Sequence, residues 1–178
     1  MISVSIAVPA PFAGELQRLR ASFGDPSAES IPTHVTLLSP TEVADDQGPE
    51  IREHLQRVAA VQQPFTMMLR STGTFLPVSP VVFVQVAGGI SACERIETAI
   101  RTGPLKRDVQ FHYHTHVTVA HRVEDSSMDR AFNELASYQC AFEVGAFDLF
   151  EHGDDLVWHP VCRFDFNAGV ISPPGRLR

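Results

Sequence analysis

The sequence predicts an α+β protein whose second half repeats the order of strands and helices of the first. Three observations support this prediction. Strand-like and helix-like segments follow the order β-α-β-α-β-β in residues 1–87 and α-β-α-β-β in residues 90–166. Each half contains a short strand that begins His-Val-Thr, at His34 and at His116. These histidines lie 82 residues apart, about half the chain, as a duplicated structural unit would place them.

The elements of the first half follow from hydrophobic periodicity and from the residues that interrupt it. Apolar residues alternate with small ones at the N-terminus, which indicates a half-buried strand. A helical spacing of apolar residues follows and stops at Gly24, and a second such pattern has Pro49 in its first turn and Pro64 at its end. The expected elements are strands at 2–8, 34–38, 65–75 and 80–87 and helices at 12–23 and 48–63. His54 lies in the second of these helices near acidic neighbours and is expected to be exposed.

The second half shows the same kinds of signal. Gly103 and Pro104 end one apolar helical pattern, and Ser126 with Asp129 forms a weak capping box at the start of another. The last two strands are expected to form a hairpin whose turn is residues 152–155. The expected elements are helices at 90–101 and 126–138 and strands at 115–122, 141–150 and 156–166.

The composition is ordinary for a soluble globular protein and argues against one that coats nucleic-acid duplexes. Apolar residues make up 44% and charged residues 20% of the 178 residues. The formal net charge of −7 disfavours binding along duplex DNA, because that mode neutralises many phosphates with Lys and Arg. A small or terminal phosphate remains compatible with this charge. Disorder is expected only in the tail at 172–178.

The cysteines and the apolar segments indicate a protein of the cytoplasm. Cys93, Cys140 and Cys162 are widely spaced and include no CxxC pair, which fits reduced thiols better than a disulfide framework. The segment MISVSIAVPAPFAG has no basic region before its apolar run, so it resembles a first strand more than a signal peptide. No segment approaches the ~20 apolar residues of a membrane helix. We expect the chain to act away from membranes and as a monomer.

The two halves share the motif His-x-Thr-aliphatic. It reads Thr33-His34-Val35-Thr36-Leu37 in the first half and Thr115-His116-Val117-Thr118-Val119 in the second. On a strand, residues i and i+2 point to the same face, so each histidine points with its threonine while the aliphatic residues point into the packing. Two imidazoles and two hydroxyls can therefore line one cleft between symmetric lobes.

These four groups suit acid-base chemistry at a phosphodiester. An imidazole can accept or deliver a proton near neutral pH, because its reference pKa is about 6.5. One imidazole would activate water while the other protonates the departing sugar oxygen, each contributing about 10²- to 10⁴-fold. The threonine hydroxyls would donate to the non-bridging oxygens, where negative charge grows in the transition state. This chemistry requires no metal.

The paired motifs, with the matching contexts PTHVTLLSP and YHTHVTVAH, resemble the 2H phosphoesterase superfamily, specifically its bacterial 2′-5′ RNA ligase-like branch. The resemblance spans residues 1–166. It implies one bilobal domain over 1–178, made of two pseudo-symmetric lobes of mainly antiparallel sheet flanked by helices, with a central cleft. It also implies hydrolysis of 2′,3′-cyclic phosphates on RNA ends or small nucleotides without a cofactor. Some members make or break 2′-5′ linkages.

The resemblance implies roles for the residues of the motifs. His34 and His116 would be the acid and the base, in either order, because a near-symmetric site can exchange them when the reaction is reversed. Thr36 and Thr118 would bind the phosphate.

The sequence departs from the family pattern around both motifs. Many relatives have Pro before the motif histidine, where this chain has Thr33 and Thr115, and relatives often carry Arg where this chain has His121. Arg122, one residue later, would share the motif face by strand parity and is a candidate phosphate ligand. Tyr113 is a candidate for stacking on a base or ribose, since aromatic faces accept bases with little sequence preference. For Tyr113 a packing role is the alternative, and for Arg122 the alternative is a plain surface arginine.

Two other functions are compatible with the sequence. His112 and His114 share a strand face with His116 and could offer three ligands to a metal, but side chains of one strand converge poorly on a tetrahedral ion. A nucleotide- or RNA-end-binding module without turnover is the second alternative, and the departures around the second motif favour it. We expect catalysis, because a pure binder needs no proton-transfer pair.

Overall fold

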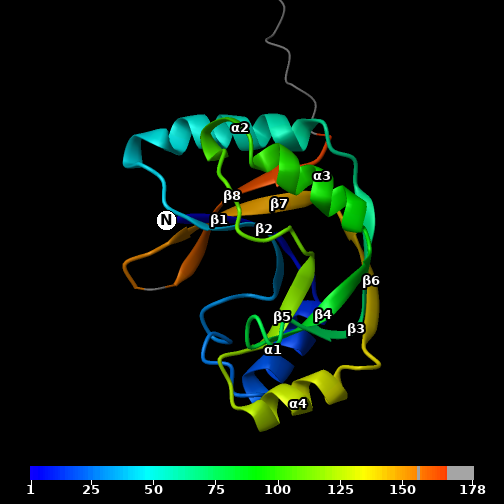
Figure 1. The fold of residues 1–178 in the computed structure, drawn as a ribbon. Helices are drawn as coiled ribbons and strands as arrows, with labels where there is room; N and C mark the ends of the chain where they lie inside the picture. The colour runs from blue at the N-terminus through cyan, green and yellow to red at the C-terminus, as the bar shows by residue number, and fades with distance from the viewer. Residues whose placement is uncertain (156, 168–178) are drawn as a thin grey trace, which may run out of the picture.

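Two four-stranded antiparallel sheets form the frame of the molecule in the computed structural model, which describes residues 1–155 and 157–167 (Figure 1). The first sheet has the strand order β2-β1-β7-β8 and the second has the order β5-β4-β3-β6. The strands are β1 (Ile2–Ala7), β2 (His34–Thr41), β3 (Phe65–Thr74), β4 (Val81–Gly88), β5 (His116–His121), β6 (Gln139–Val144), β7 (Ala146–His152) and β8 (Trp158–Asp165).

Four α-helices in the described part of the chain flank the sheets, which confirms the predicted class of two antiparallel lobes with helices around them. In Figure 1, the helices at 48–60 and 90–100 lie above the first sheet, and those at 12–22 and 125–134 lie below the second. Two short 3₁₀ turns, Asp45–Gln47 and Gly103–Leu105, complete the regular structure of residues 1–155 and 157–167. The helices are α1 (Phe12–Ser22), α2 (Gly48–Ala60), α3 (Ile90–Ile100) and α4 (Asp125–Glu134).

The helix that precedes each motif strand packs on the opposite sheet. β1 and β2 pair with each other, but the intervening α1 contacts β5 of the second sheet. Likewise β4 and β5 pair, but the intervening α3 contacts β2 of the first sheet. This exchange ties the two lobes together and brings β2 into contact with β5, the two strands that begin with the motif histidines.

The core is a single hydrophobic cluster that includes buried side chains from both sheets and from all four helices. The aliphatic positions of both motifs belong to it, with exposed fractions of 0–2%. Each such side chain contributes about 1.5–3 kcal/mol on full burial. This burial fixes which face of β2 and of β5 is left for the histidines. The four residues are Val35, Leu37, Val117 and Val119.

The expected strand at 141–150 is wrong as a single element. The chain forms β6 in the second sheet and β7 in the first, and it crosses between them at Gly145. The alternation of buried residues breaks at the same place, because Ala146 and Phe147 are consecutive and both buried. A strand that changes sheets must turn its buried face toward a new neighbour, which period-two patterning alone does not reveal. Phe142 therefore pairs with β3, and the last hairpin is β7–β8.

Three smaller expectations also differ from the structure. The strand at His34 continues through Pro40 to the end of β2. The helix expected at 126–138 is α4, which begins at Asp125 without a side-chain cap and ends at Glu134, so the expected capping box does not form. His54, expected to be exposed on α2, is only 6% exposed, because its Nε2 lies 3.0 Å from the carbonyl oxygen of Ile100 at the end of α3.

The expected tail at 172–178 lies outside the described residues. Among the helices that the structure describes, none combines the length and the apolar character needed to span a bilayer.

Candidate active site

The histidine and threonine of each motif lie on the partly exposed face of a strand. His34 is the first residue of β2 and His116 is the first residue of β5. In both strands the burial alternates from half-buried histidine to buried valine to half-buried threonine. The expected strand faces are therefore present in both lobes.

Both imidazoles are anchored by the same backbone contact. Nδ1 of His34 lies 2.6 Å from the carbonyl oxygen of Pro32, and Nδ1 of His116 lies 2.8 Å from that of His114. Because a carbonyl oxygen only accepts, Nδ1 carries the proton in both rings. Each neutral ring then has a bare Nε2 that can accept a proton, and each charged ring has an Nε2–H that can donate one.

Two hollows adjoin at the first motif. The larger, of about 830 Å³, is lined by His116, and the smaller, of about 330 Å³, is lined by His34. Thr36 lines both, and its hydroxyl lies 3.1 Å from Nε2 of His34. The two imidazoles thus border adjoining hollows that share one threonine.

Burial lowers the pKa of both histidines, and their mutual repulsion adds to the effect at His116. Loss of water around the rings is the main cause at both positions, and the backbone hydrogen bonds oppose it. The pKa of His116 falls to about 4, with further contributions from the positive charges of His114 and His34. At His34 the positive charge of Arg20 adds to the effect of burial.

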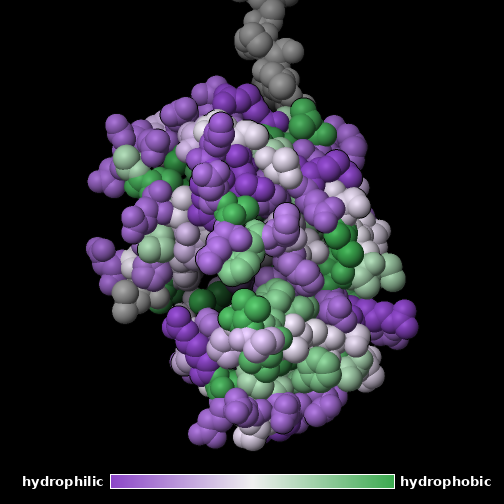
Figure 2. Space-filling view, viewed as in Figure 1, coloured by the Kyte–Doolittle hydropathy of each residue, from purple (hydrophilic) through white to green (hydrophobic). Residues whose placement is uncertain are grey.

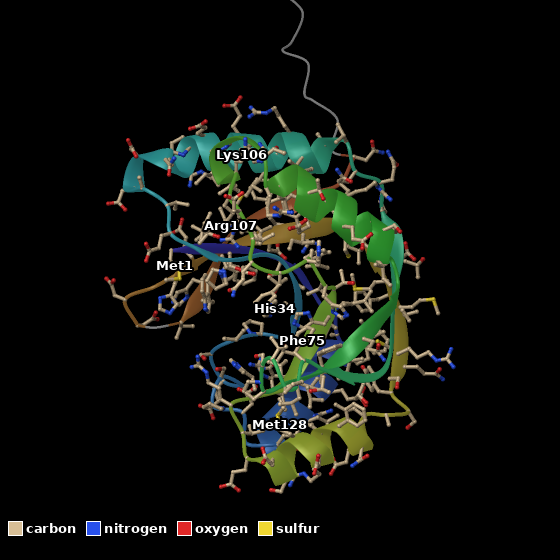
Figure 3. All side chains as sticks on the ribbon, in the orientation of Figure 1. Met1, His34, Phe75, Lys106, Arg107 and Met128 are labelled. Atoms are coloured by element: carbon tan, nitrogen blue, oxygen red, sulfur yellow. The ribbon has the colours of Figure 1, made fainter. Side chains whose placement is uncertain are left out.

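Phenylalanine side chains create the dry surroundings of His116. The ring of Phe75 meets that of His116 edge to face at 4.9 Å between centroids, and Phe83 lies at 5.2 Å. In Figure 3, Phe75 and His34 lie in the middle of the view, where the two lobes meet. Sequence reasoning placed Phe75 only at the end of a strand. The pairing of β4 with β5 brings the β3–β4 hairpin to His116, and no local signal encodes that pairing.

Thr33, which stands where many relatives have Pro, supports the first motif from behind. It is buried, and its hydroxyl donates to Oε1 of Gln17 on α1 at 2.6 Å. Its backbone carbonyl accepts from the amide of Val8, just after β1. The departure from the family pattern therefore adds a link between α1 and the start of β2.

Tyr113 packs between the lobes. Its hydroxyl donates to the carbonyl oxygen of Thr36 at 2.9 Å, and its ring packs against the core while also lining the larger hollow. Burial raises the pKa of this phenol above its usual value. The residue therefore joins the loop before β5 to the first motif, whatever contact it makes with a ligand.

The premise behind the prediction for Arg122 is not met. β5 ends at His121, and Arg122 has φ of 57°, in the left-handed region, so strand parity no longer fixes its direction. Arg122 is exposed, and His121 lines the smaller hollow. Thr118 is half-buried and faces Phe83 across the β4–β5 pair. Within the described chain, neither Arg122 nor Thr118 lines the two hollows.

The histidines of the second motif region do not form a metal cage. His112 and His114 line the larger hollow, and the ring of His114 lies 5.9 Å from that of His116. The residues covered by the structure include no set of three His, Cys, Asp or Glu side chains placed to hold one ion.

The two lobes meet at β2 and β5, and each of these strands begins with His-x-Thr. This arrangement defines the class of two-histidine phosphoesterase folds. The family model of the 2′-5′ RNA ligase superfamily matches residues 8–156, and the chain belongs to this superfamily.

Sequence relatives cover most of the chain at low identity. A Bacillus licheniformis protein named “Putative phosphoesterase” is 25% identical over 136 residues, which are 75% of this chain and 80% of the relative. A Halalkalibacterium halodurans protein with the same description is 26% identical over 136 residues, which are 75% and 79% of the two chains.

Solved structures share the fold. E. coli LigT, solved with 3′-AMP, is similar with a TM-score of 0.66 and 19% identity, over 93% of this chain and 97% of LigT. A Thermus thermophilus protein is similar with a TM-score of 0.60 and 19% identity, over 93% and 97% of the two chains.

Proposed function

We propose that this protein is a phosphoesterase that opens 2′,3′-cyclic phosphates on RNA ends or small nucleotides by two-histidine acid-base catalysis. The observation that carries the proposal is the matched pair of imidazoles. Both are held through Nδ1 by a backbone carbonyl, and both border hollows that adjoin at Thr36.

The reaction needs two proton transfers. One neutral imidazole takes a proton from water through its bare Nε2, and the water oxygen forms a bond to phosphorus. The other imidazole, charged, gives its Nε2 proton to the 2′ or 3′ oxygen as the bond from that oxygen to phosphorus breaks. The product is a phosphate monoester with a free neighbouring hydroxyl. Proton exchange with solvent restores the starting state of both rings.

The same arrangement also offers a contact to the reacting phosphate and permits a ligation reaction. The hydroxyl of Thr36 lies beside His34, where it can donate to a non-bridging oxygen of the bound phosphate. Thr118, the corresponding residue of the second motif, lines neither hollow, so the proposal gives this contact to Thr36. When a 5′-hydroxyl replaces water as the attacking group, the same steps join two RNA ends. The 3′-AMP bound to E. coli LigT has its phosphate on the ribose, as a product of cyclic-phosphate opening would.

His34→Ala and His116→Ala test the proposal directly. Each variant should lower turnover of nucleoside 2′,3′-cyclic phosphates by at least about 10²-fold, because each removes one proton transfer. The assay should separate 2′- from 3′-phosphate products, and circular dichroism should show an unchanged fold. His159→Ala is the matched control, since His159 is exposed on β8 and pairs only with Asp155 within the described chain. Unchanged hydrolysis in either motif variant would refute the proposal.

The lowered pKa values favour a second candidate, a nucleotide-end-binding module. Because burial lowers the pKa of both imidazoles, the charged form that donates a proton is disfavoured near pH 7 in the free protein. Saturable binding of cyclic or monophosphate nucleotides, with no product after long incubation at high protein concentration, would support this candidate over catalysis.

A further inference from the structure

The larger hollow extends well beyond the catalytic pair. It begins at Thr36 and His116 and continues along β2 to the loop at 106–112, where Arg107 lines it. Its volume of about 830 Å³ lies near the upper end of the ~300–1,000 Å³ typical of small-molecule sites. The reacting phosphate therefore occupies only one end of it.

Arg107 lines this hollow with unused hydrogen-bonding capacity. The side chain is anchored by a hydrogen bond from Nη1 to the hydroxyl of Thr41, the last residue of β2. Its Nε is buried, and among the described residues it has no hydrogen-bond partner. Arg107 also forms no ion pair within the described part of the chain. A buried guanidinium donor without a partner is costly unless a ligand supplies one.

The other charged groups of the hollow differ from Arg107. Arg101 also lines it, but two nitrogens of its guanidinium bind the carboxylate of Glu97, which is buried, so its charge is balanced. The exposed carboxylate of Asp108 also lines the hollow and opposes binding of an anion. Of the two arginines that line the hollow, Arg107 is thus the one whose charge no carboxylate of the described chain pairs with.

The hollow also has an apolar part of its lining. Phe75, Leu76, Val109 and Phe111 line it, although Phe111 is 64% exposed and Leu76 is 51% exposed. Figure 2 shows hydrophobic side chains around the hollowed middle of this face. Exposed aromatic and aliphatic groups of this kind suit the flat faces of nucleobases.

The spacing separates the two anion positions. The stretch of extended strand from Thr36 to Thr41 spans about 16 Å. In Figure 3, Arg107 lies toward α2 and α3, away from the middle of the view where His34 lies. The oxygens of one phosphate group cannot reach both Thr36 and the residue anchored at Thr41.

We infer that Arg107 binds a second phosphate, on the 5′ side of the reacting nucleotide, so that the preferred substrate carries this phosphate in addition to the cyclic one. This inference rests on the proposed function. The second phosphate has two sources, a 5′-monophosphate on the reacting nucleotide or an internal phosphodiester.

The test compares kcat/KM for adenosine 2′,3′-cyclic phosphate, its 5′-phosphorylated form, and di- and triadenylates with a cyclic phosphate end. The same oligonucleotides with neutral methylphosphonate links keep the size and remove the charge. We expect a gain of about ten- to a hundredfold for one of the doubly charged substrates over adenosine 2′,3′-cyclic phosphate, since charge-assisted hydrogen bonds to phosphate are strong. Which substrate gains identifies the source.

Arg107→Ala should abolish this gain and leave hydrolysis of adenosine 2′,3′-cyclic phosphate unchanged, and Arg107→Lys should restore part of it. Arg57→Ala, at an exposed arginine of α2 that pairs with Glu53, removes the same charge and should keep the gain. Equal kcat/KM for charged and methylphosphonate substrates in the wild-type protein would overturn the inference even if Arg107→Ala failed to fold. A gain that survives Arg107→Ala would also overturn it. Failure to open any substrate would instead disprove the proposed function, and the inference with it.

Discussion

His34 and His116 have the same backbone anchor but different neighbours. The Nε2 of His34 faces the hydroxyl of Thr36, whereas Phe75 and Phe83 surround the ring of His116. Aromatic groups displace water and disfavour the charged imidazole, which accounts for the pKa of about 4 at His116. The pKa values of the two imidazoles therefore depend on the surrounding side chains and not on the sequence motif alone.

These pKa shifts predict an acidic optimum for kcat/KM. Catalysis needs one neutral and one charged imidazole, so the active fraction of free enzyme is greatest between the two pKa values of the pair. Both pKa values are lowered from 6.5, hence kcat/KM should fall as pH rises through neutrality, because the proton donor is lost. The profile of kcat should lie at higher pH, since a bound phosphate stabilises the charged ring. Initial-rate measurements from about pH 4 to 9 check this, and a kcat/KM optimum above about pH 7 would contradict it.

A buried ion pair holds the segment that leads into β2. Nε of Arg20, on α1, donates to Oδ2 of Asp25 at 2.8 Å, and the side chains are 5% and 0% exposed. Another nitrogen of Arg20 donates to the carbonyl oxygen of Ile31, two residues before Thr33. The pair thus positions the start of the first motif from the opposite lobe.

Asp25→Asn should destabilise the protein by about 3–5 kcal/mol, because it leaves the charge of Arg20 buried without its partner. Urea denaturation followed by circular dichroism measures the change. Arg57→Ala, which breaks only an exposed pair on α2, should cost less than about 1 kcal/mol. A similar cost for the two substitutions would show that the Arg20–Asp25 pair does not hold this segment.

Local periodicity predicted most elements but not where a strand changes partners. The alternation that located β1, β2 and β5 depends on a buried and an exposed face, which neighbouring residues record. The segment 141–150 also alternates, but its two parts face different sheets, and only Gly145 marks the crossing. His54 was misplaced for a related reason, since its burial depends on the end of α3, far away in the sequence.

The exchanged helices and the continuous core join both lobes. α1 lies on the second sheet, α2 and α3 lie on the first, and the buried residues of both sheets form one cluster. If the second sheet unfolded, the buried face of α1 would become exposed, and if the first sheet unfolded, that of α3 would.

We therefore predict one cooperative unfolding transition. Trp158, the single tryptophan, begins β8 in the first sheet and reports on that lobe by fluorescence, while far-ultraviolet circular dichroism reports on both lobes. The two urea titration curves should coincide. Separate midpoints would show that the chain is two independent folding units and not one bilobal domain.

Neighbouring residues are enough to predict the two His-x-Thr strands, the face that each presents and the resemblance to the superfamily to which the chain belongs. These properties depend on a few neighbouring residues, so they can be read locally. Only the tertiary structure placed Phe75 on His116, joined the two hollows at Thr36 and aligned Arg107 with the far end of β2. Contacts between residues so distant in the chain are decided by the packing of both lobes together, and no local pattern records that packing.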